Sequence, residues 1–275
     1  MGWYKNIIYW RENGALRISI PFTWMVDTAR KFAENEKLPV VVGGPGAVLM
    51  RYKIDWATVG MDARRDVLSM FNPLATMTSR GCPNRCAFCA VPKIEGAFRE
   101  LDTWSIASMI CDNNFLACSM SHIVKVISSV QHFKGVDFNQ GLEAARFNNH
   151  HAILFSRLKQ PKIRFSFDSM AEKGAVEKAV NLCREHGLKN ISVYCLIGFK
   201  DTPQEALDKL EWLRAIKVQP VPMRYQPLDA TVKDSYLNES AGWTEREMRR
   251  MVRYWFRQNW LSKIPYAEFN GWNIF

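Results

Sequence analysis

Short apolar runs alternate with amphipathic helical patterns along most of the chain. The apolar runs predict buried strands bounded by turn residues. The predicted strands are 17–20, 39–44, 75–78, 107–111, 135–139, 162–167, 190–199 and 222–226. The clearest helical patterns, each with one apolar face, cover 24–37, 171–186, 202–216 and 244–261. Strands that alternate with helices predict a parallel sheet with right-handed crossovers.

Capping residues mark the ends of two predicted helices. Thr202 suits the N-cap of a helix that has Pro203 at its first position and Glu205 closing a capping box. Gly187 suits the left-handed position that ends the helix before it. These residues support two crossover helices between strands.

Six predicted strands lie between Ala75 and Gln226. That number suits an open, TIM-like partial (β/α)6 barrel better than a closed barrel of eight strands. The sequence therefore predicts an α/β fold in three parts, with the first boundary within Met61–Asn72. The parts are a small α/β segment of one or two βαβ units (1–70), the partial barrel (71–230) and a C-terminal helical extension (231–275).

Composition excludes several classes of protein. The 275 residues are 48% hydrophobic and 23% charged, which is a globular balance and not that of a disordered chain. No apolar stretch is long enough to span a membrane, and the first residues do not resemble a secretory signal, so we expect a cytoplasmic protein. The 37 Lys and Arg exceed the 27 Asp and Glu, giving a net charge of +10. This excess fits either an anionic partner or an ordinary solvated surface.

Three of the seven cysteines fall within eight residues, in the segment Ser79–Cys89. Cys82, Cys86 and Cys89 have the spacing C-x3-C-x2-C and follow a predicted strand directly. Three thiolates this close in sequence suit three corners of a cubane iron–sulfur cluster, which leaves the fourth iron for a small molecule. A structural zinc site is the alternative, and it needs a fourth ligand. His122, Cys111 and Cys118 are the candidates for that ligand.

The cysteine segment resembles the radical S-adenosylmethionine (radical SAM) superfamily. In that family the motif is C-x3-C-x-aromatic-C after the first strand of a partial barrel, and Phe88 fills the aromatic position. The resemblance covers about 73–228 and extends to the polar ends of later strands. It implies a SAM site made by these strand ends, with the following residues: Asp112 and Asn113 near the amino group, Asn139, Ser166 and Asp168 near other polar atoms, and Ile197 and Gly198 along adenine.

Two related groups of enzymes fit less well. The segment 39–47 resembles the end of a cobalamin-binding domain, but all five histidines follow the cluster motif, so we expect no cobalamin. Methylthiotransferases carry three further cysteines upstream, whereas this chain has none before Cys82. We interpret Cys111, Cys118, Cys183 and Cys195 as buried thiols and not as ligands of a second cluster.

The resemblance implies a radical mechanism. The [4Fe–4S] cluster receives an electron from a donor such as flavodoxin or ferredoxin and passes it to SAM. Cleavage of a carbon–sulfur bond then gives a 5′-deoxyadenosyl radical, which removes hydrogen from a substrate.

An arginine stripe on the predicted helix 244–261 is the one indication of a substrate. It comprises Arg246, Arg249, Arg250, Arg253 and Arg257, opposite an apolar face. Such a stripe can follow phosphates, with Tyr254 and Trp260 as stacking surfaces, or can be a solvated basic face. Three functions stay open: a radical SAM enzyme acting on a nucleic acid or nucleotide, one acting on a peptide or small metabolite, and a non-enzymatic iron–sulfur or zinc module.

Overall fold

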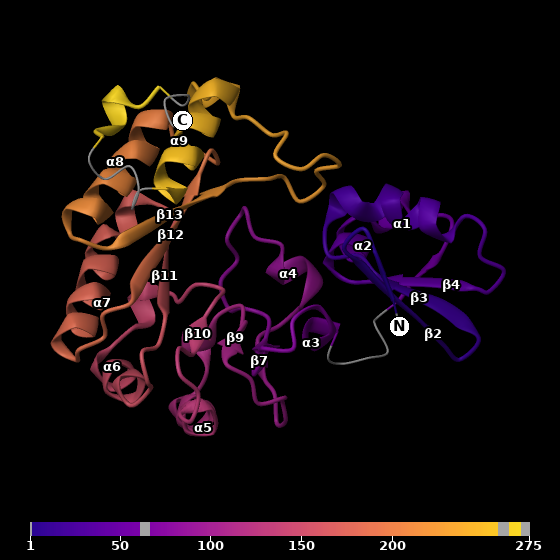
Figure 1. Ribbon diagram of the computed structural model, residues 1–275, viewed down its shortest axis with the longest axis horizontal. Coiled ribbons are helices and arrows are strands. Elements are labelled where there is room, and N and C mark those ends of the chain that lie inside the picture. The colour runs from indigo at the N-terminus through magenta and orange to yellow at the C-terminus, as the bar shows by residue number, and fades with distance from the viewer. Residues whose placement is uncertain (1, 61–66, 258–263, 271–275) are drawn as a thin grey trace. The chain divides into compact units, whose positions relative to one another are not determined.

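The computed structural model describes residues 2–60, 67–257 and 264–270. The chain divides into two compact units, drawn in Figure 1. The first unit comprises Met1–Thr76, Gly81–Phe98 and Gln226–Ser235. The second comprises Met77–Arg80, Arg99–Tyr225 and Tyr236–Phe275. The three motif cysteines therefore belong to the first unit, and the candidate SAM-binding strand ends belong to the second.

The first unit contains a five-stranded sheet in the order β1-β2-β3-β4-β5. The strands are β1 (Gly2–Tyr4), β2 (Ile7–Glu12), β3 (Ala15–Ser19), β4 (Val40–Gly43) and β5 (Thr58–Val59). The first three are antiparallel, and β3, β4 and β5 are parallel. The helices are α1 (Val26–Ala33), α2 (Pro45–Leu49), α3 (Val67–Phe71) and α4 (Val91–Ile94). Since α1 and α2 connect the parallel strands, the predicted βαβ units are confirmed, with an additional antiparallel hairpin before them.

Two glycines let the chain after β4 approach its neighbours closely. Gly44 has φ +86°, and a Cβ atom there would lie 2.7 Å from the Ile20 carbonyl oxygen. A Cβ atom on Gly46 would lie 2.5 Å from the Phe22 carbonyl oxygen. The Gly46 amide donates to the Ile20 carbonyl at 2.9 Å. The glycines of the segment 39–47 thus serve close backbone packing within the first unit.

The second unit is built from parallel strands that succeed one another along the chain. Its strands β9 (Met109–Ile110) and β10 (Asp137–Phe138) pair in parallel, as do β11 (Ile163–Phe167), β12 (Ile191–Ile197) and β13 (Gln219–Arg224). Single bridges such as Asp137↔Lys162 and Leu142↔Phe165 connect β10 to β11. The short strands β7 (Ser79–Arg80) and β8 (Arg99–Glu100) form an antiparallel pair. The α/β class is confirmed, and the sheets of residues 2–60, 67–257 and 264–270 do not close into a barrel.

Helices cover one face of the β11–β13 sheet. The helices of this unit are α5 (Met120–Val130), α6 (Asn149–Ser156), α7 (Lys173–Glu185), α8 (Pro203–Ala215) and α9 (Glu245–Phe256). Helices α7 and α8 pack against this sheet (Figure 1). Along β11, Ile163, Phe165 and Phe167 are buried, whereas Arg164 and Ser166 between them are half-buried. The helix-covered face is therefore the core, and the other face carries polar side chains.

The predicted capping box of α8 and the predicted glycine at the end of α7 are both confirmed. The Thr202 hydroxyl accepts from the Glu205 amide at 3.2 Å, and the Glu205 carboxylate accepts from the Thr202 amide at 2.8 Å. Gly187 follows α7 with φ +72°. Helix α9 covers Glu245–Phe256 of the predicted range, with Thr244 as its N-cap, and 258–261 with Trp260 lies outside the described residues. Within the described ranges, no helix combines the length and apolar character that a membrane crossing needs.

Three strands are shorter than predicted or divided. The prediction 75–78 becomes β6 (Ala75–Thr76) and β7, and the predictions 107–111 and 135–139 become two-residue strands. One physical reason is visible at Thr78, whose amide donates to the Asp112 carboxylate at 2.5 Å. A backbone donor used in this way is not available to a neighbouring strand. Side-chain hydrogen bonds therefore interrupt the ladder at this point.

Candidate functional site

The three motif cysteines lie on one loop of the first unit, between β7 and α4. Cys86 is exposed, and Cys82 and Cys89 are half-buried, as is Phe88. The Cys89 amide donates to the Cys86 carbonyl at 3.0 Å, which makes a tight turn between these two ligand candidates. The Asn84 amide donates to the Cys82 sulfur at 3.4 Å. Amide donation of this kind stabilises negative charge on a thiolate.

Gly81 fixes the start of this loop. Its φ is +75°, and a Cβ atom there would lie 2.6 Å from the Ala97 carbonyl oxygen. A residue with a side chain would therefore meet both backbone strain and a backbone clash. Gly81 thus lets the chain just before Cys82 pass close to the backbone of Gly96 and Ala97.

The donor set of the loop fits an iron–sulfur cluster, because thiolates are the usual ligands of such clusters. Among the described residues, however, no three His, Cys, Asp or Glu side chains are arranged so that they hold a metal ion. Cys82, Cys86 and Cys89 thus lie on one short loop, but their sulfur atoms do not form a metal-binding group.

The candidates for a fourth zinc ligand all belong to the second unit. Cys111 and Cys118 are buried, and burial raises the pKa of their thiols to about 11 and about 12, respectively. The ring of His122 is buried, with Nε2 3.2 Å from the Thr78 hydroxyl and Nδ1 3.6 Å from the Glu100 carboxylate. These contacts give His122 a role within the second unit.

At the end of β9, the two predicted SAM contacts differ in their surroundings. Asp112 is buried and accepts from the Thr78 amide and hydroxyl at 2.5 and 2.6 Å and from the Ser79 hydroxyl at 2.7 Å. Burial raises the pKa of Asp112, and the hydrogen bonds from Thr78 and Ser79 oppose that shift. The Asn113 side-chain nitrogen is also buried but has no hydrogen-bond partner among the described residues. Asn113 is thus the one of the two that has a buried side-chain donor without a partner among the described residues.

Polar side chains of β10, β11 and β12 meet on the sheet face away from the helices. Arg164 donates to both carboxylate oxygens of Asp137, at 2.6 and 2.8 Å. The Tyr194 hydroxyl donates to the Asn139 carbonyl at 3.0 Å. Asn139 and Ser166 are both half-buried. This face brings together two of the predicted SAM contacts with an ion pair that the sequence analysis did not identify.

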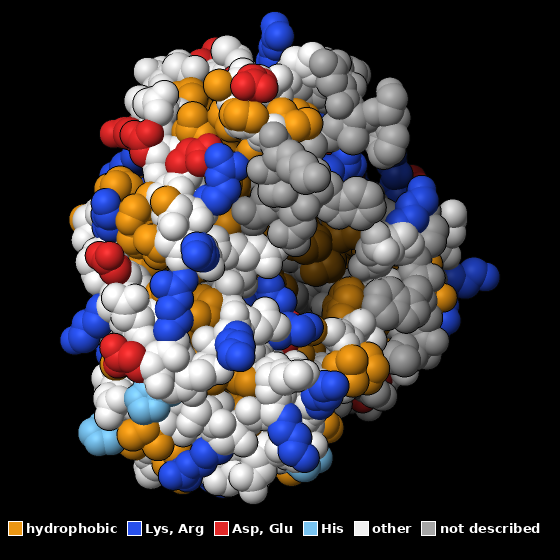
Figure 2. All heavy atoms as spheres, turned by 60° about the vertical axis from the view of Figure 1, so that its left-hand side comes forward, with side chains coloured by type: hydrophobic (Ala, Val, Ile, Leu, Met, Phe, Trp, Pro, Cys, Tyr) orange, Lys and Arg blue, Asp and Glu red, His pale blue; other side chains and the backbone are white. Residues whose placement is uncertain are grey.

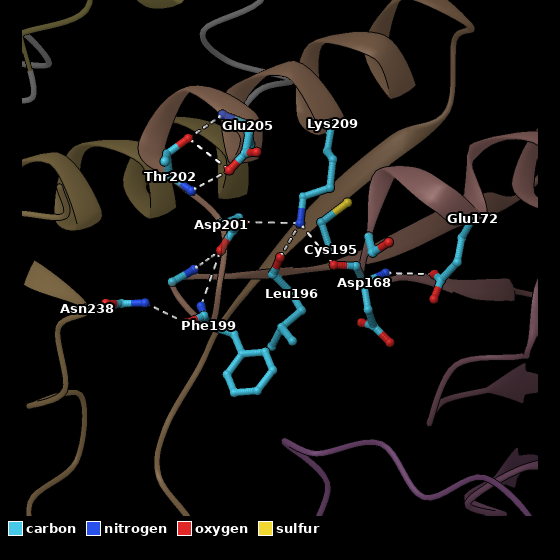
Figure 3. Close-up of polar contacts among 12 residues, drawn as sticks. Asp168, Glu172, Cys195, Leu196, Phe199, Asp201, Thr202, Glu205, Lys209 and Asn238 are labelled. Carbon is cyan, nitrogen blue, oxygen red and sulfur yellow. Dashed lines mark hydrogen bonds and ion pairs between the residues drawn. The ribbon is translucent and has the colours of Figure 1, made fainter. Parts of the chain in front are cut away.

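The ends of β11 and β12 are held by a buried lysine (Figure 3). Lys209 of α8 is 2% exposed, and its ammonium group lies 3.1 Å from the Asp201 carboxylate. It also donates to the Leu196 carbonyl at 2.6 Å and to the Asp168 carbonyl at 3.3 Å. The other Asp201 oxygen accepts from the amides of Gly198 and Phe199 at 2.8 and 3.2 Å. We call Lys209, Asp201 and these backbone groups the lysine clamp.

Asp168 lies at the edge of the lysine clamp. Burial and the nearby Glu172 raise the pKa of its carboxyl to about 6, and Lys209 opposes that shift. The Glu172 carboxylate accepts from the Asp168 amide at 2.9 Å. In Figure 3 the Asp168 carboxylate points away from the Lys209 ammonium group. The carboxylate is therefore available to a ligand while its backbone is held.

Ile197 and Gly198 are closely packed at the end of β12. The Ile197 side chain is fully buried, and its carbonyl accepts from the Tyr225 amide at 2.9 Å. Gly198 has φ +79°, and a Cβ atom there would lie 2.6 Å from the Met248 side chain. The Gly198 amide donates to the Asp201 carboxylate, so both backbone groups have partners within the protein, and the contact of this segment with adenine stays a prediction.

The arginines of α9 have different surroundings. Arg246, Arg249, Arg253 and Arg257 are exposed, and Arg249 forms an ion pair with Glu245. Arg250 instead donates to the carbonyls of Tyr266, Ala267 and Phe269, and its guanidinium lies 4.3 Å from the Tyr266 ring. Arg250 thus holds the C-terminal segment against α9. On the face drawn in Figure 2, Lys and Arg side chains are spread widely, and acidic side chains are fewer.

The sequence analysis missed Lys209 and Asp201. The helical pattern of α8 contains the indication, because Lys209 falls among Ala206, Leu210 and Leu213 on the buried face. A lysine at such a position predicts a buried partner, since lysine is almost never fully buried unless it is paired.

No family model matches this chain, and no curated protein matches it.

Proposed function

We propose that this protein is a radical SAM enzyme that binds one [4Fe–4S] cluster through Cys82, Cys86 and Cys89. The observation that carries the proposal is the cysteine loop: its C-x3-C-x2-C spacing with Phe88, its tight turn, and the amide that donates to the Cys82 sulfur. The alternative of a structural zinc site is less well supported, because three thiolates on one loop lack the fourth ligand that zinc requires.

The proposal includes a partial (β/α)6 barrel. Its support is the order of the parallel strands β9 to β13, which succeed one another along the chain with helices between them. Ligands of such folds bind at the carboxyl ends of the strands. Asn113, Asn139, Asp168 and Gly198 all lie at or just after strand ends.

When bound, the cluster supplies the electron that cleaves SAM reductively. The roles of the chain are binding, orientation and exclusion of water. The buried Asn113 amide is proposed to donate to a SAM oxygen, and the Asp168 carboxylate to accept from the amino or ribose groups. The Ile197–Gly198 backbone is proposed to lie along adenine. Asp112, with all its hydrogen bonds made within the protein, is proposed to hold Asn113 in place.

Iron analysis of anaerobically reconstituted protein tests the cluster. The wild-type chain is expected to hold about four irons, the stoichiometry of a cubane. Cys86→Ala is expected to lose them, whereas Cys183→Ala, which changes a buried thiol of α7, is the matched control and is expected to keep them. Full iron content in a Cys82/Cys86/Cys89 triple alanine variant contradicts the proposal.

For the substrate we propose a nucleic acid or nucleotide. The support is the net charge of +10 and the four exposed arginines of α9. Phosphate contacts release counterions, so binding is expected to weaken steeply with salt. Replacing Arg246 and Arg253 with Gln is expected to flatten the salt dependence, while Lys31→Gln and Lys37→Gln, exposed on the first unit, leave it unchanged. Salt-independent binding, or SAM cleavage stimulated only by a peptide or metabolite, contradicts this assignment.

An acidic electron carrier of the flavodoxin or ferredoxin type is the proposed redox partner.

A further inference from the structure

Burying the charged group of a lysine costs free energy unless that group has partners within the protein. Lys209 is 2% exposed, and its ammonium group has contacts with Asp201, Leu196 and Asp168. The ammonium group thus has two hydrogen bonds to backbone carbonyls and one ion pair with a carboxylate, so its charge is compensated within the protein. The lysine therefore has one defined position, at the carboxyl ends of two neighbouring strands.

The acceptors of Lys209 are adjacent to the proposed SAM contacts. Phe167 of β11 and Cys195 of β12 are paired, and the carbonyls that accept from Lys209 belong to the residue that follows each of them, Asp168 and Leu196. Asp201 continues the same set of contacts, because its second oxygen accepts from the Gly198 and Phe199 amides. The clamp thus fixes the backbone on both sides of Ile197 and at Asp168.

Further contacts hold the clamp from the C-terminal part of the second unit. The Asn238 side chain donates to the Phe199 carbonyl at 2.6 Å, and the Trp243 indole donates to the Asp201 carbonyl at 2.6 Å. Figure 3 shows the Lys209 side chain extending from α8 to these strand ends. The ammonium group therefore joins helix α8 to both strand ends, and the segment before α9 holds the backbone of Phe199 and Asp201 beside it.

We propose that Lys209 is a positioning residue for SAM, which orients the Asp168 carboxylate and the Ile197–Gly198 backbone through the lysine clamp. The inference rests on the proposed function and deepens it, since it adds a residue that does not itself touch the ligand.

The charges around Asp168 give the proposal a specific readout. The ionisable groups near it are Glu172, Lys209, Asp201 and Cys195. Lys209 is the one cation among these groups and lowers the pKa of Asp168, while burial and Glu172 raise it. Loss of the Lys209 charge is therefore expected to raise the pKa of Asp168. A lysine that only stabilises the fold has no reason to change how SAM binding depends on pH.

The test compares Lys209→Met with Lys178→Met, an exposed lysine of α7. Carbon-13 NMR follows the titration of the Asp168 carboxyl, and equilibrium dialysis of the reconstituted protein without reductant measures SAM binding across pH. In the wild type the NMR midpoint is expected near pH 6. In Lys209→Met the midpoint and the pH dependence of SAM binding are expected to move upward together, with affinity at pH 7 falling about tenfold. Lys178→Met is expected to match the wild type.

The outcomes separate this inference from the proposed function. If the wild type binds SAM and Lys209→Met keeps the same affinity and pH dependence, the positioning role is wrong and the proposed function stands. If the wild type does not bind SAM, the proposed function is wrong and the positioning role fails with it. Should Lys209→Met not fold, Asp201→Asn keeps an oxygen for the Gly198 and Phe199 amides and removes the charge. It is expected to weaken SAM binding severalfold, and unchanged affinity overturns the proposal.

Discussion

Replacing Asp112 with Ala is expected to destabilise the protein strongly. The carboxylate accepts three hydrogen bonds, from the Thr78 amide, the Thr78 hydroxyl and the Ser79 hydroxyl. Thr78 and Ser79 are fully buried, so water does not replace the lost acceptor without a rearrangement. Each buried donor left unsatisfied costs about 1–3 kcal/mol, and the two hydroxyls are able to rotate toward other acceptors. The expected loss in the free energy of unfolding is therefore about 3 to 5 kcal/mol, a large part of a typical domain's stability.

Asp112→Asn separates the hydrogen bonds from the charge. The Asn oxygen still accepts from the Thr78 amide, and the hydroxyls are able to turn and accept from its NH₂ group. Burial raises the pKa of Asp112 above its ordinary value of 3.8. The folded state therefore holds the proton more tightly, and ionisation costs stability as pH rises above that value. Asn lacks this cost, so its effect at pH 7 is expected to be well below that of Ala.

Urea unfolding followed by circular dichroism measures both changes. The transition midpoint is expected to fall most for Asp112→Ala, less for Asp112→Asn and not at all for Asp102→Ala, an exposed aspartate of the same unit. The urea dependence of the unfolding free energy should stay constant, because the folded state keeps its buried surface. An Asp112→Ala variant as stable as the wild type, with impaired SAM binding only, refutes a structural role for this carboxylate.

Three further results are expected. The pKa of Asp168 is raised to about 6 in the folded protein, so ionisation of its carboxyl lowers the free energy of unfolding from about pH 4 upward. Asp168→Asn should therefore be more stable than the wild type at pH 8 but not at pH 3.5. The same dependence of stability on pH in both proteins contradicts this. Gly46→Ala should lower the melting temperature more than Gly174→Ala, since its Cβ atom would lie 2.5 Å from a carbonyl oxygen while that of Gly174 has nothing within 4 Å; equal melting temperatures contradict this. Arg250→Ala should increase proteolysis of the C-terminal segment, whereas the exposed Arg246→Ala should not; equal cleavage rates contradict the role of Arg250.

The local sequence was sufficient to predict most long elements. The apolar run of β12 and the capping residues of α8 act locally, so both elements lie close to their predicted positions. The hairpin between β2 and β3 was missed, although Asn13-Gly14 is the usual indication of a two-residue turn. Both residues have positive φ, +51° and +69°, as that turn requires. The apolar and polar positions of β2 alone did not indicate its antiparallel pairing.

The site could be predicted from the sequence only where it depends on residues that are close together in the chain. The cysteine loop depends on spacing within one segment, and the sequence displays that spacing completely. The roles of Asp112 and Lys209 depend on contacts 34 and 41 residues away, with Thr78 and Asp168. Polar residues at strand ends look alike in sequence. Only tertiary contacts distinguish Asp112, whose carboxylate accepts three hydrogen bonds, from Asn113, whose buried side-chain nitrogen has no partner among the described residues.

The central claim is that this chain cleaves SAM at a cluster held by the cysteine loop. The most direct measurement is anaerobic incubation of reconstituted protein with SAM and dithionite, with 5′-deoxyadenosine quantified by mass spectrometry. The wild type is expected to release 5′-deoxyadenosine in proportion to enzyme and time, and Cys86→Ala to release none above the protein-free background. Equal product from the wild type and Cys86→Ala, or none from wild-type protein that holds a full complement of iron, contradicts the account.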